Sequence, residues 1–377
     1  MRSALGARLL VRSHTGTKPT RTSLYFVDLV TQRKHCETSR DPINPQFQRQ
    51  ICYIRGNLPV TTQARGSLQY EEFYGFVQSP FTLAPDPRFL YPSPSHEEAI
   101  RLLLQTIERR EGVAVVSGDI GTGKTTVCRT VLEQLDMKLF TSLVLNPFLS
   151  GDELLREILL DFGVISREAV RSGRIIAASR HELIATLHEF LTSLLPIGAS
   201  GVLIIDEAQH LSPQVLEEIR VLSNLETNRS KLLQIVLVGQ LSLIDLLKQP
   251  QLKQLDQRVS LRAVLTPLGR MDLEAYVIHR LSVAGETGQV AFEERALDVV
   301  LRASGGVPRL INLICDRGLM IGAQSDARVI TTQMINASVA SLGLHRPRRL
   351  HRWWPEIQLG RLASLFDWRR WTNRVSS

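Results

Sequence analysis

Apolar residues along the middle of the chain follow two patterns: short continuous runs, and longer stretches with helical spacing. We expect the continuous runs to be buried strands, at residues 113–117, 139–145, 202–205, 232–238 and 259–265. We expect amphipathic helices between them, at 123–135, 152–162, 181–194, 213–225 and 241–247. Apolar strands separated by such helices predict a parallel sheet that is covered by helices on both faces. The predicted fold class is therefore α/β.

The strand pattern stops near residue 270. Helical patterns follow at 271–284, 293–304, 308–323 and 331–342, and they predict a small all-helical domain, which we call the lid. We therefore expect an α/β domain over residues 70–267 and the lid over 268–344.

The α/β domain begins with a segment rich in aromatic residues and proline. Its prolines are Pro80, Pro85, Pro87, Pro92 and Pro94. Proline at this density excludes a helix interior, so we expect residues 73–94 to be an extended strap packed on the domain. Ser95 and Glu98 match a capping box, which predicts that the next helix opens there.

The ends of the chain are basic and the middle is acidic. Residues 1–70 contain 11 Lys/Arg and 3 Asp/Glu, and residues 345–377 contain 8 and 2. This leaves 26 basic and 32 acidic residues between them, a net charge of −6. The sequence pI of about 9.6 therefore reflects the ends. It does not indicate a nucleic-acid surface along the folded core.

Residues 1–69 show no sustained period, so we expect a disordered basic leader, although a functional basic arm remains the alternative. Residues 345–377 carry all four tryptophans among arginines. This composition suits an anionic membrane surface, and a solvated tail without a partner is the alternative. The sequence shows no membrane-spanning run and no signal peptide, and its four cysteines have no metal or redox spacing. We expect a cytoplasmic protein, peripheral at the inner membrane if the tail binds lipid.

A phosphate-binding loop is predicted where an apolar run meets a helical one. Residues 118–125 fit the pattern Gly-x-x-x-x-Gly-Lys-Ser/Thr, in which backbone N–H groups and a helix N-terminus face the phosphates. We expect Lys124 to reach the β- and γ-phosphates of ATP and the Thr125 hydroxyl to bind Mg²⁺. The expected nucleotide-binding residues are Gly118, Asp119, Ile120, Gly121, Thr122, Gly123, Lys124, Thr125 and Thr126.

A second predicted strand, 202–205, ends in two acidic residues. Asp206 lies where open α/β sheets bind ligands, so we expect it to hold Mg²⁺ together with Thr125. Glu207 is placed to orient and polarise the attacking water. A strand between these two motifs would bring Gln240 next to the γ-phosphate as a sensor of that water, and a simple turn residue at the end of the strand is the alternative role.

Two arginines are candidates for contact with the γ-phosphate. Arg258 precedes the last strand and would reach the nucleotide of a neighbouring subunit as an arginine finger, with Arg262 as its competitor. Arg309 follows Pro308 at the start of a lid helix, from which it could reach back to the nucleotide. A structural salt bridge is the alternative role for both Arg258 and Arg309.

These motifs, together with longer strings, resemble the AAA+ ATPases of the general secretion pathway protein A type (ExeA/GspA), including MshM-type relatives in pilus biogenesis. The similar region runs from about Tyr70 to Leu344. The matching strings are FYGF, PFTL, PDPRFLY, GDIGTGKTT, NP (146–147), LIIDEAQ, LSNLET, KLLQIVLVGQ, QRV and GVPRLIN. The family strings LSNLET and KLLQIVLVGQ are more specific than the nucleotide motifs. In place of the family's proline and acid after Gln240, this chain has Leu241 and Ser242.

The resemblance implies a ring-forming homo-oligomer that uses ATP to drive assembly of a secretion or pilus system with partners at the inner membrane. It also implies that Asn146 couples the ligand state to Glu207, and that the strap lies over the adenine. Family members continue into a membrane helix and a peptidoglycan-binding domain that these residues do not include, so we expect membrane contact through the tail or a partner. Two other functions stay open: a DNA-dependent transposition regulator of the TnsC/TniB kind, which the acidic core disfavours, and an ATP-binding scaffold, which Glu207 disfavours.

Overall fold

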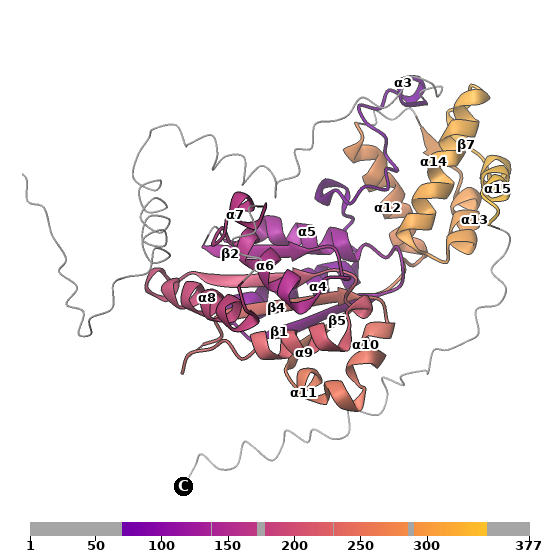
Figure 1. The fold of residues 1–377 in the computed structure, drawn as a ribbon. Coiled ribbons are helices and arrows are strands. Elements are labelled where there is room, and N and C mark those ends of the chain that lie inside the picture. The colour runs from indigo at the N-terminus through magenta and orange to yellow at the C-terminus, as the bar shows by residue number, and fades with distance from the viewer. Residues whose placement is uncertain (1–69, 137, 172–177, 229, 286–289, 345–377) are drawn as a thin grey trace, which may run out of the picture.

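The computed structural model describes residues 70–136, 138–171, 178–228, 230–285 and 290–344. The predictions made for the leader and the tail therefore fall outside the described residues. A five-stranded sheet has the order β2-β3-β4-β1-β5, with every pair parallel (Figure 1). Its strands are β1 (Val113–Gly118), β2 (Leu139–Val144), β3 (Ser200–Ile205), β4 (Leu233–Gly239) and β5 (Val259–Leu265). The predicted parallel sheet is confirmed.

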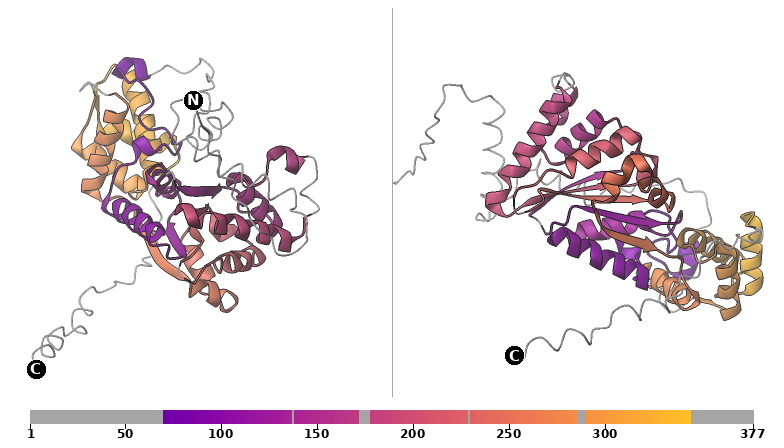
Figure 2. Two further views of the ribbon diagram at one scale, coloured as in Figure 1. Left: turned by 90° about the vertical axis from the view of Figure 1, so that its left-hand side faces the viewer. Right: turned by 90° about the horizontal axis from the view of Figure 1, so that it is seen from below.

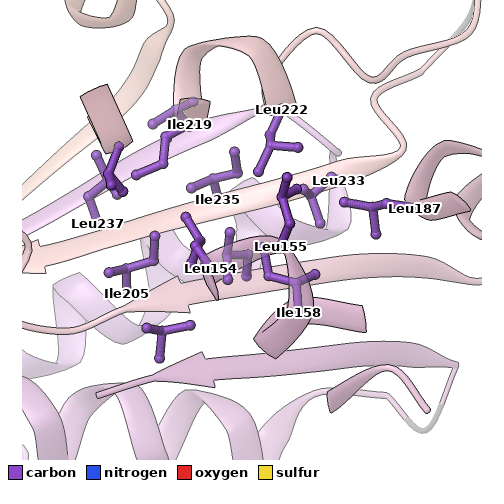
Figure 3. Close-up of a cluster of buried hydrophobic side chains, with 14 of the residues drawn as sticks. Leu154, Leu155, Ile158, Leu187, Ile205, Ile219, Leu222, Leu233, Ile235 and Leu237 are labelled. Atoms are coloured by element: carbon purple, nitrogen blue, oxygen red, sulfur yellow. The ribbon is translucent and has the colours of Figure 1, made fainter. Parts of the chain in front are cut away.

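Helices cover the sheet on both faces, in three layers (Figure 2). One face packs against α4 (Pro94–Glu108) and α5 (Lys124–Gln134). The other packs against α6 (Gly151–Asp161), α8 (Arg180–Ser193), α9 (Pro213–Leu222), α10 (Ser242–Leu247) and α11 (Lys253–Asp256). Figure 3 shows part of this second core, where α6 and α9 meet β3 and β4. The shorter elements are α7 (Arg167–Arg171), η2 (Leu195–Ile197), η3 (Ala208–His210) and η4 (Pro250–Leu252).

The continuous apolar runs are explained by these two layers of helices. Val113 and Val115 of β1 point into one core, whereas Ala114 and Val116 point into the other. Successive side chains of a strand face opposite sides of a sheet, so a strand covered on both sides needs an apolar residue at every position. All six residues of β1 and of β3 are buried.

The lid has a hydrophobic core of its own. It contains α12 (Arg270–Val283), α13 (Glu294–Ser304), α14 (Pro308–Gln324) and α15 (Thr332–Ser341). The prediction of an all-helical unit missed one feature, a parallel pair of strands, β6 (Ala291–Phe292) with β7 (Val329–Ile330). Each strand has two residues, too few to show a period of two in the sequence. None of the described helices is long and apolar enough to cross a membrane.

The strap packs mainly on the lid, and it contains two short helical turns, α3 (Tyr70–Tyr74) and η1 (Pro87–Phe89). Its aromatic side chains Tyr74, Phe76, Phe81 and Phe89 are buried in the lid core. The buried guanidinium of Arg280 on α12 donates to Pro80 O at 2.6 Å and to Thr82 O at 2.8 Å. From the other side, Arg129 of α5 donates to Pro85 O at 3.0 Å. The strap therefore bridges the lid and the helix that follows the phosphate-binding loop.

The predicted capping box at Ser95 and Glu98 is wrong. Helix α4 begins at Pro94 with Ser93 as its N-cap. Proline favours the first helical position because its φ is already fixed near the helical value, so the helix starts one residue before the expected serine. Glu98 binds Arg101 instead, at 2.6 Å.

Candidate functional site

The loop between β1 and α5 has the geometry of an anion-binding turn at a helix N-terminus. Gly121 and Gly123 have φ values of +82° and +95°, in the left-handed region that residues with a side chain rarely adopt. Gly123 is the N-cap of α5, whose first backbone N–H groups have no partner within the helix. A helix N-terminus of this kind attracts phosphate through those N–H groups and through the helix dipole.

Lys124 is the first residue of α5 and is buried. Its ammonium group donates to Gly118 O at 3.0 Å and to Asp119 O at 2.9 Å, so the lysine closes the loop from inside. Burial lowers the pKa of Lys124, while the negative charges of Glu207 and Asp206 act in the opposite direction. The side chain is thus held in the loop that is expected to receive phosphates.

The two residues expected to hold magnesium lie together. Thr125 Oγ1 donates to Asp206 Oδ2 at 2.6 Å, and Asp206 is buried at the carboxyl end of β3. A hydroxyl and a carboxylate are the hard oxygen ligands that Mg²⁺ prefers. The described residues contain no group of three His, Cys, Asp or Glu that could form an all-protein cage. Magnesium commonly takes one or two protein ligands and completes its shell with phosphates and water, so this pair fits it.

Glu207 follows Asp206 with a left-handed backbone, at φ +52°. Its backbone N–H donates to Asp206 Oδ1 at 2.9 Å, and its carboxylate Oε2 accepts from Gln209 Nε2 at 2.6 Å. Gln209 Oε1 in turn accepts from the backbone N–H of Gln240 at 2.9 Å. The sheet order places β4 between β3 and β1, as expected, so Gln240 lies at the same edge as the loop and the two acids.

Asn146 follows β2 on the other side of β3 and is exposed. Its Oδ1 accepts from the backbone N–H of Phe148 at 3.1 Å, which makes a local turn. In the described residues the amide that bonds to Glu207 belongs to Gln209. The coupling role that the resemblance implies for Asn146 stays a prediction.

The lid reaches the phosphate-binding loop through Arg309, near the start of α14. Its backbone N–H donates to Gly121 O at 3.2 Å. A Cβ added to Gly121 would lie 2.7 Å from the Cβ of Arg309, so the two backbones are in close contact. The side chain of Arg309 is exposed and starts beside the loop. The structure therefore brings Arg309 to the site.

Arg258 lies at the opposite edge of the sheet. It precedes β5, whose seven residues run parallel to β1. At roughly 3.3 Å per residue, this strand separates Arg258 from the loop edge by about 20 Å. The competitor Arg262 pairs with Asp256 at 2.7 Å. Arg258 therefore does not reach the site of its own chain.

His96 and Gln209 are two residues of the site that the sequence motifs do not indicate. His96 Nε2 donates to Thr122 O at 2.9 Å, and its Nδ1 accepts from the Ser93 hydroxyl at 2.6 Å. Burial lowers the pKa of His96, which favours the neutral ring that this arrangement needs. A single histidine 26 residues before Thr122 gives no signal in the sequence. Gln209 lies in the LIIDEAQ string, but its partner Gln240 comes from another strand.

Comparison with known proteins identifies the fold and a relative. Residues 107–247 match the AAA domain family. The chain is 42% identical over 251 residues to general secretion pathway protein A of Aeromonas hydrophila. The aligned region covers 67% of this chain and 44% of that protein. The chain thus spans less than half the length of this relative.

Among solved structures, the Aeropyrum pernix ORC2 protein in its ADPNP–ADP complexes is similar with a TM-score of 0.52 and 15% identity, over 70% of this chain and 71% of that chain. Cdc6p from Pyrobaculum aerophilum is similar with a TM-score of 0.52 and 19% identity, over 68% of this chain and 71% of that chain. At these identities the likeness shows a shared P-loop ATPase fold.

Proposed function

We propose that this chain, an AAA-domain protein related to general secretion pathway protein A, binds Mg·ATP at the loop edge of its sheet and hydrolyses it. The observation that carries the proposal is the contact between Thr125 and Asp206, 2.6 Å long, beside Lys124 and Glu207. One constellation thus supplies a cation for the phosphates, oxygen ligands for magnesium and a carboxylate for water. Phosphoryl transfer depends on such positioning and charge neutralisation.

Each residue has a distinct task in this proposal. The loop N–H groups and Lys124 bind the β- and γ-phosphates, and Thr125 with Asp206 holds the ion, which when bound neutralises phosphate charge. Glu207 accepts a hydrogen bond from the attacking water and orients it. Gln240 at the end of β4 contacts the same water, and Arg309 senses the γ-phosphate from the lid.

We propose that Arg258 completes the site of a neighbouring subunit in a homo-oligomeric ring. The support is its position about 20 Å from the loop of its own chain, at the amino end of a parallel strand. A partly exposed arginine at that edge is available to a second copy. In the neighbour's site it would stabilise transition-state charge.

We propose that the cycle drives assembly of a secretion or pilus system at the inner membrane. The support is the relative, whose name assigns it to the general secretion pathway. Contact with the membrane would run through the basic tail or a membrane partner, and the rest of the chain would stay in the cytoplasm.

ATP turnover by the purified chain tests the enzymatic proposal. We expect magnesium-dependent hydrolysis that Lys124→Ala abolishes, because the substituted loop loses its phosphate cation. Arg302→Ala on the outer surface of the lid is the control and should hydrolyse ATP normally. Absence of turnover in the unmodified chain, or normal turnover in Lys124→Ala, would contradict the proposal.

The pathway needs a separate experiment in cells. A strain lacking the chain should lose assembled secretin or pilus, and the unmodified gene but not Lys124→Ala should restore it. Stimulation of turnover by DNA, with a steep loss of stimulation as salt rises, would instead favour the transposition-regulator alternative. The solved structures similar to this chain show the fold alone and do not favour DNA.

A further inference from the structure

We propose that Gln209 is a positioning residue that holds the carboxylate of Glu207 toward the nucleotide. The inference rests on the proposed function, in which Glu207 orients the attacking water. It assigns to Gln209 the contact with Glu207 that the family resemblance implies for Asn146.

The side chain of Gln209 bonds at both ends. Its Nε2 donates to Glu207 Oε2 at 2.6 Å, and its Oε1 accepts from the backbone N–H of Gln240 at 2.9 Å. A glutamine is long enough to span the two groups and offers both a donor and an acceptor. The carboxylate of Glu207 is thereby tied to the backbone at the end of β4.

The direction of this tie follows from the order of the strands. Glu207 follows β3, the phosphate-binding loop follows β1, and β4 lies between them. A bond toward β4 therefore draws Glu207 toward the loop, whereas a bond to Asn146 after β2 would draw it away. The interaction of Glu207 with Lys124 agrees with this direction, because after burial the charge of Glu207 is the largest influence on the pKa of Lys124.

The backbone conformation near Gln209 leaves room for its two hydrogen bonds. A Cβ added to Gly239 would lie 2.6 Å from Gln209 Oε1, so glycine at the end of β4 leaves the space that the amide occupies. Glu207 has a left-handed backbone and is followed at once by the turn η3, which contains Gln209. Such conformations persist only where the surroundings fix them. One oxygen of Glu207, Oε2, is committed to Gln209, and the other can accept from water.

Asn146 does not provide an equivalent contact in this geometry. Its Oδ1 accepts from Phe148 N–H at 3.1 Å, in the turn that follows β2. Asn146 follows β2, on the side of β3 away from the loop, whereas Gln209 bonds to Glu207 and to the end of β4, on the side of the loop. Gln209 is therefore the amide whose loss should disturb the water.

The test replaces Gln209 with methionine, which keeps the approximate volume and removes both hydrogen bonds. We expect Gln209→Met to lower kcat about 10- to 100-fold, the range for losing a hydrogen bond to a charged group. The ATP dissociation constant and the melting temperature should stay within error of the unmodified chain. Gln214→Met, at an exposed glutamine of α9, is the matched control and should retain normal turnover.

A double variant separates positioning from general damage. In a Glu207→Gln background, Gln209→Met should cause no further loss in the single-turnover rate, because Gln209 acts through the carboxylate. Gln209→Asn, which keeps the amide but is too short for the span, gives a second variant if the methionine does not fold. It should also lose turnover.

Normal kcat in Gln209→Met or Gln209→Asn would overturn the inference. An equal fractional loss in the Glu207→Gln background would overturn it too, since Gln209 would then act independently of the carboxylate. If the unmodified chain does not hydrolyse ATP, the proposed function fails instead. The two failures are therefore distinguished by the unmodified chain.

Discussion

The two edges of the central sheet differ in how many of their functional groups meet within one chain. At the carboxyl edge, residues that follow three strands lie together with the lid. Three hydrogen bonds connect them: Thr125 with Asp206, Gln209 with Glu207, and Arg309 with Gly121. At the amino edge, Arg258 has none of these groups near it, because a whole strand length lies between. The carboxyl edge is assembled by the fold, whereas Arg258 lies partly exposed at the amino edge.

This difference supports the proposal that the nucleotide site is divided between copies of the chain. A parallel sheet places all its strand ends of one kind at one edge, so it concentrates ligands there and leaves the other edge without them. An arginine at the amino edge can act on a nucleotide only if that nucleotide belongs to another subunit.

The largest effect is expected at Glu207. Glu207→Gln should bind ATP and lower turnover at least about 100-fold, because the amide orients water poorly and accepts no proton. Nucleotide retention after rapid gel filtration, measured beside hydrolysis, checks both parts. Hydrolysis at the normal rate would remove Glu207 from its assigned role.

Arg309 should matter less, since it reaches the carboxyl edge from the lid. Arg309→Ala should lower kcat about tenfold through the loss of charge near the γ-phosphate. Its backbone contact with Gly121 is retained, so the melting temperature should be unchanged. Equal kcat in Arg309→Ala and in the surface control Arg302→Ala would show that the lid arginine does not take part.

Substitution of His96 should have a still smaller effect on the site, because His96 contacts the phosphate-binding loop through one hydrogen bond to Thr122 O. His96→Ala removes the donor to Thr122 O and should weaken ATP binding roughly threefold to tenfold, about the value of one hydrogen bond. His96→Gln keeps a donor on a side chain of similar reach and should recover most of the affinity. If the alanine variant binds ATP normally, the loop does not depend on this bond.

The stability of the chain should also depend on His96 through pH. Burial holds the pKa of His96 below its ordinary value of 6.5. As the pH falls, His96 is therefore protonated in the unfolded chain before it is protonated in the folded chain. The contribution of His96 to the free energy of unfolding is therefore fully present above about pH 6.5, and it decreases as the pH falls below that value. Chemical denaturation of the unmodified chain and His96→Gln between pH 5 and 8 should show a steeper loss in the unmodified chain. Equal slopes would contradict this prediction.

The sequence was sufficient to predict the sheet and the loop because both depend on local patterns. Buried strands such as β1 and β3 are apolar at nearly every position, and the loop combines its glycines with Lys124 over nine residues. The observed strand ends differ from the expected ones by at most two residues.

The missed features depend on contacts between distant residues. Gln209 meets Gln240 across 31 positions, and His96 meets Thr122 across 26. Neither pairing leaves a period or a motif, because a single side chain on one element bonds to the backbone of another. The error at Ser95 was local, since α4 begins at Pro94 with Ser93 as its N-cap, two residues before the expected cap.

A mixing experiment tests the divided site most directly. Arg258→Ala and Glu207→Gln should each be nearly inactive alone, one for lack of the neighbour's arginine and the other for lack of its own carboxylate. When equal amounts are mixed in a ring, about a quarter of the sites should pair an intact Glu207 with an intact Arg258, and turnover should recover to that extent. No recovery at any ratio, from variants shown to assemble together, would contradict a site shared between neighbouring subunits.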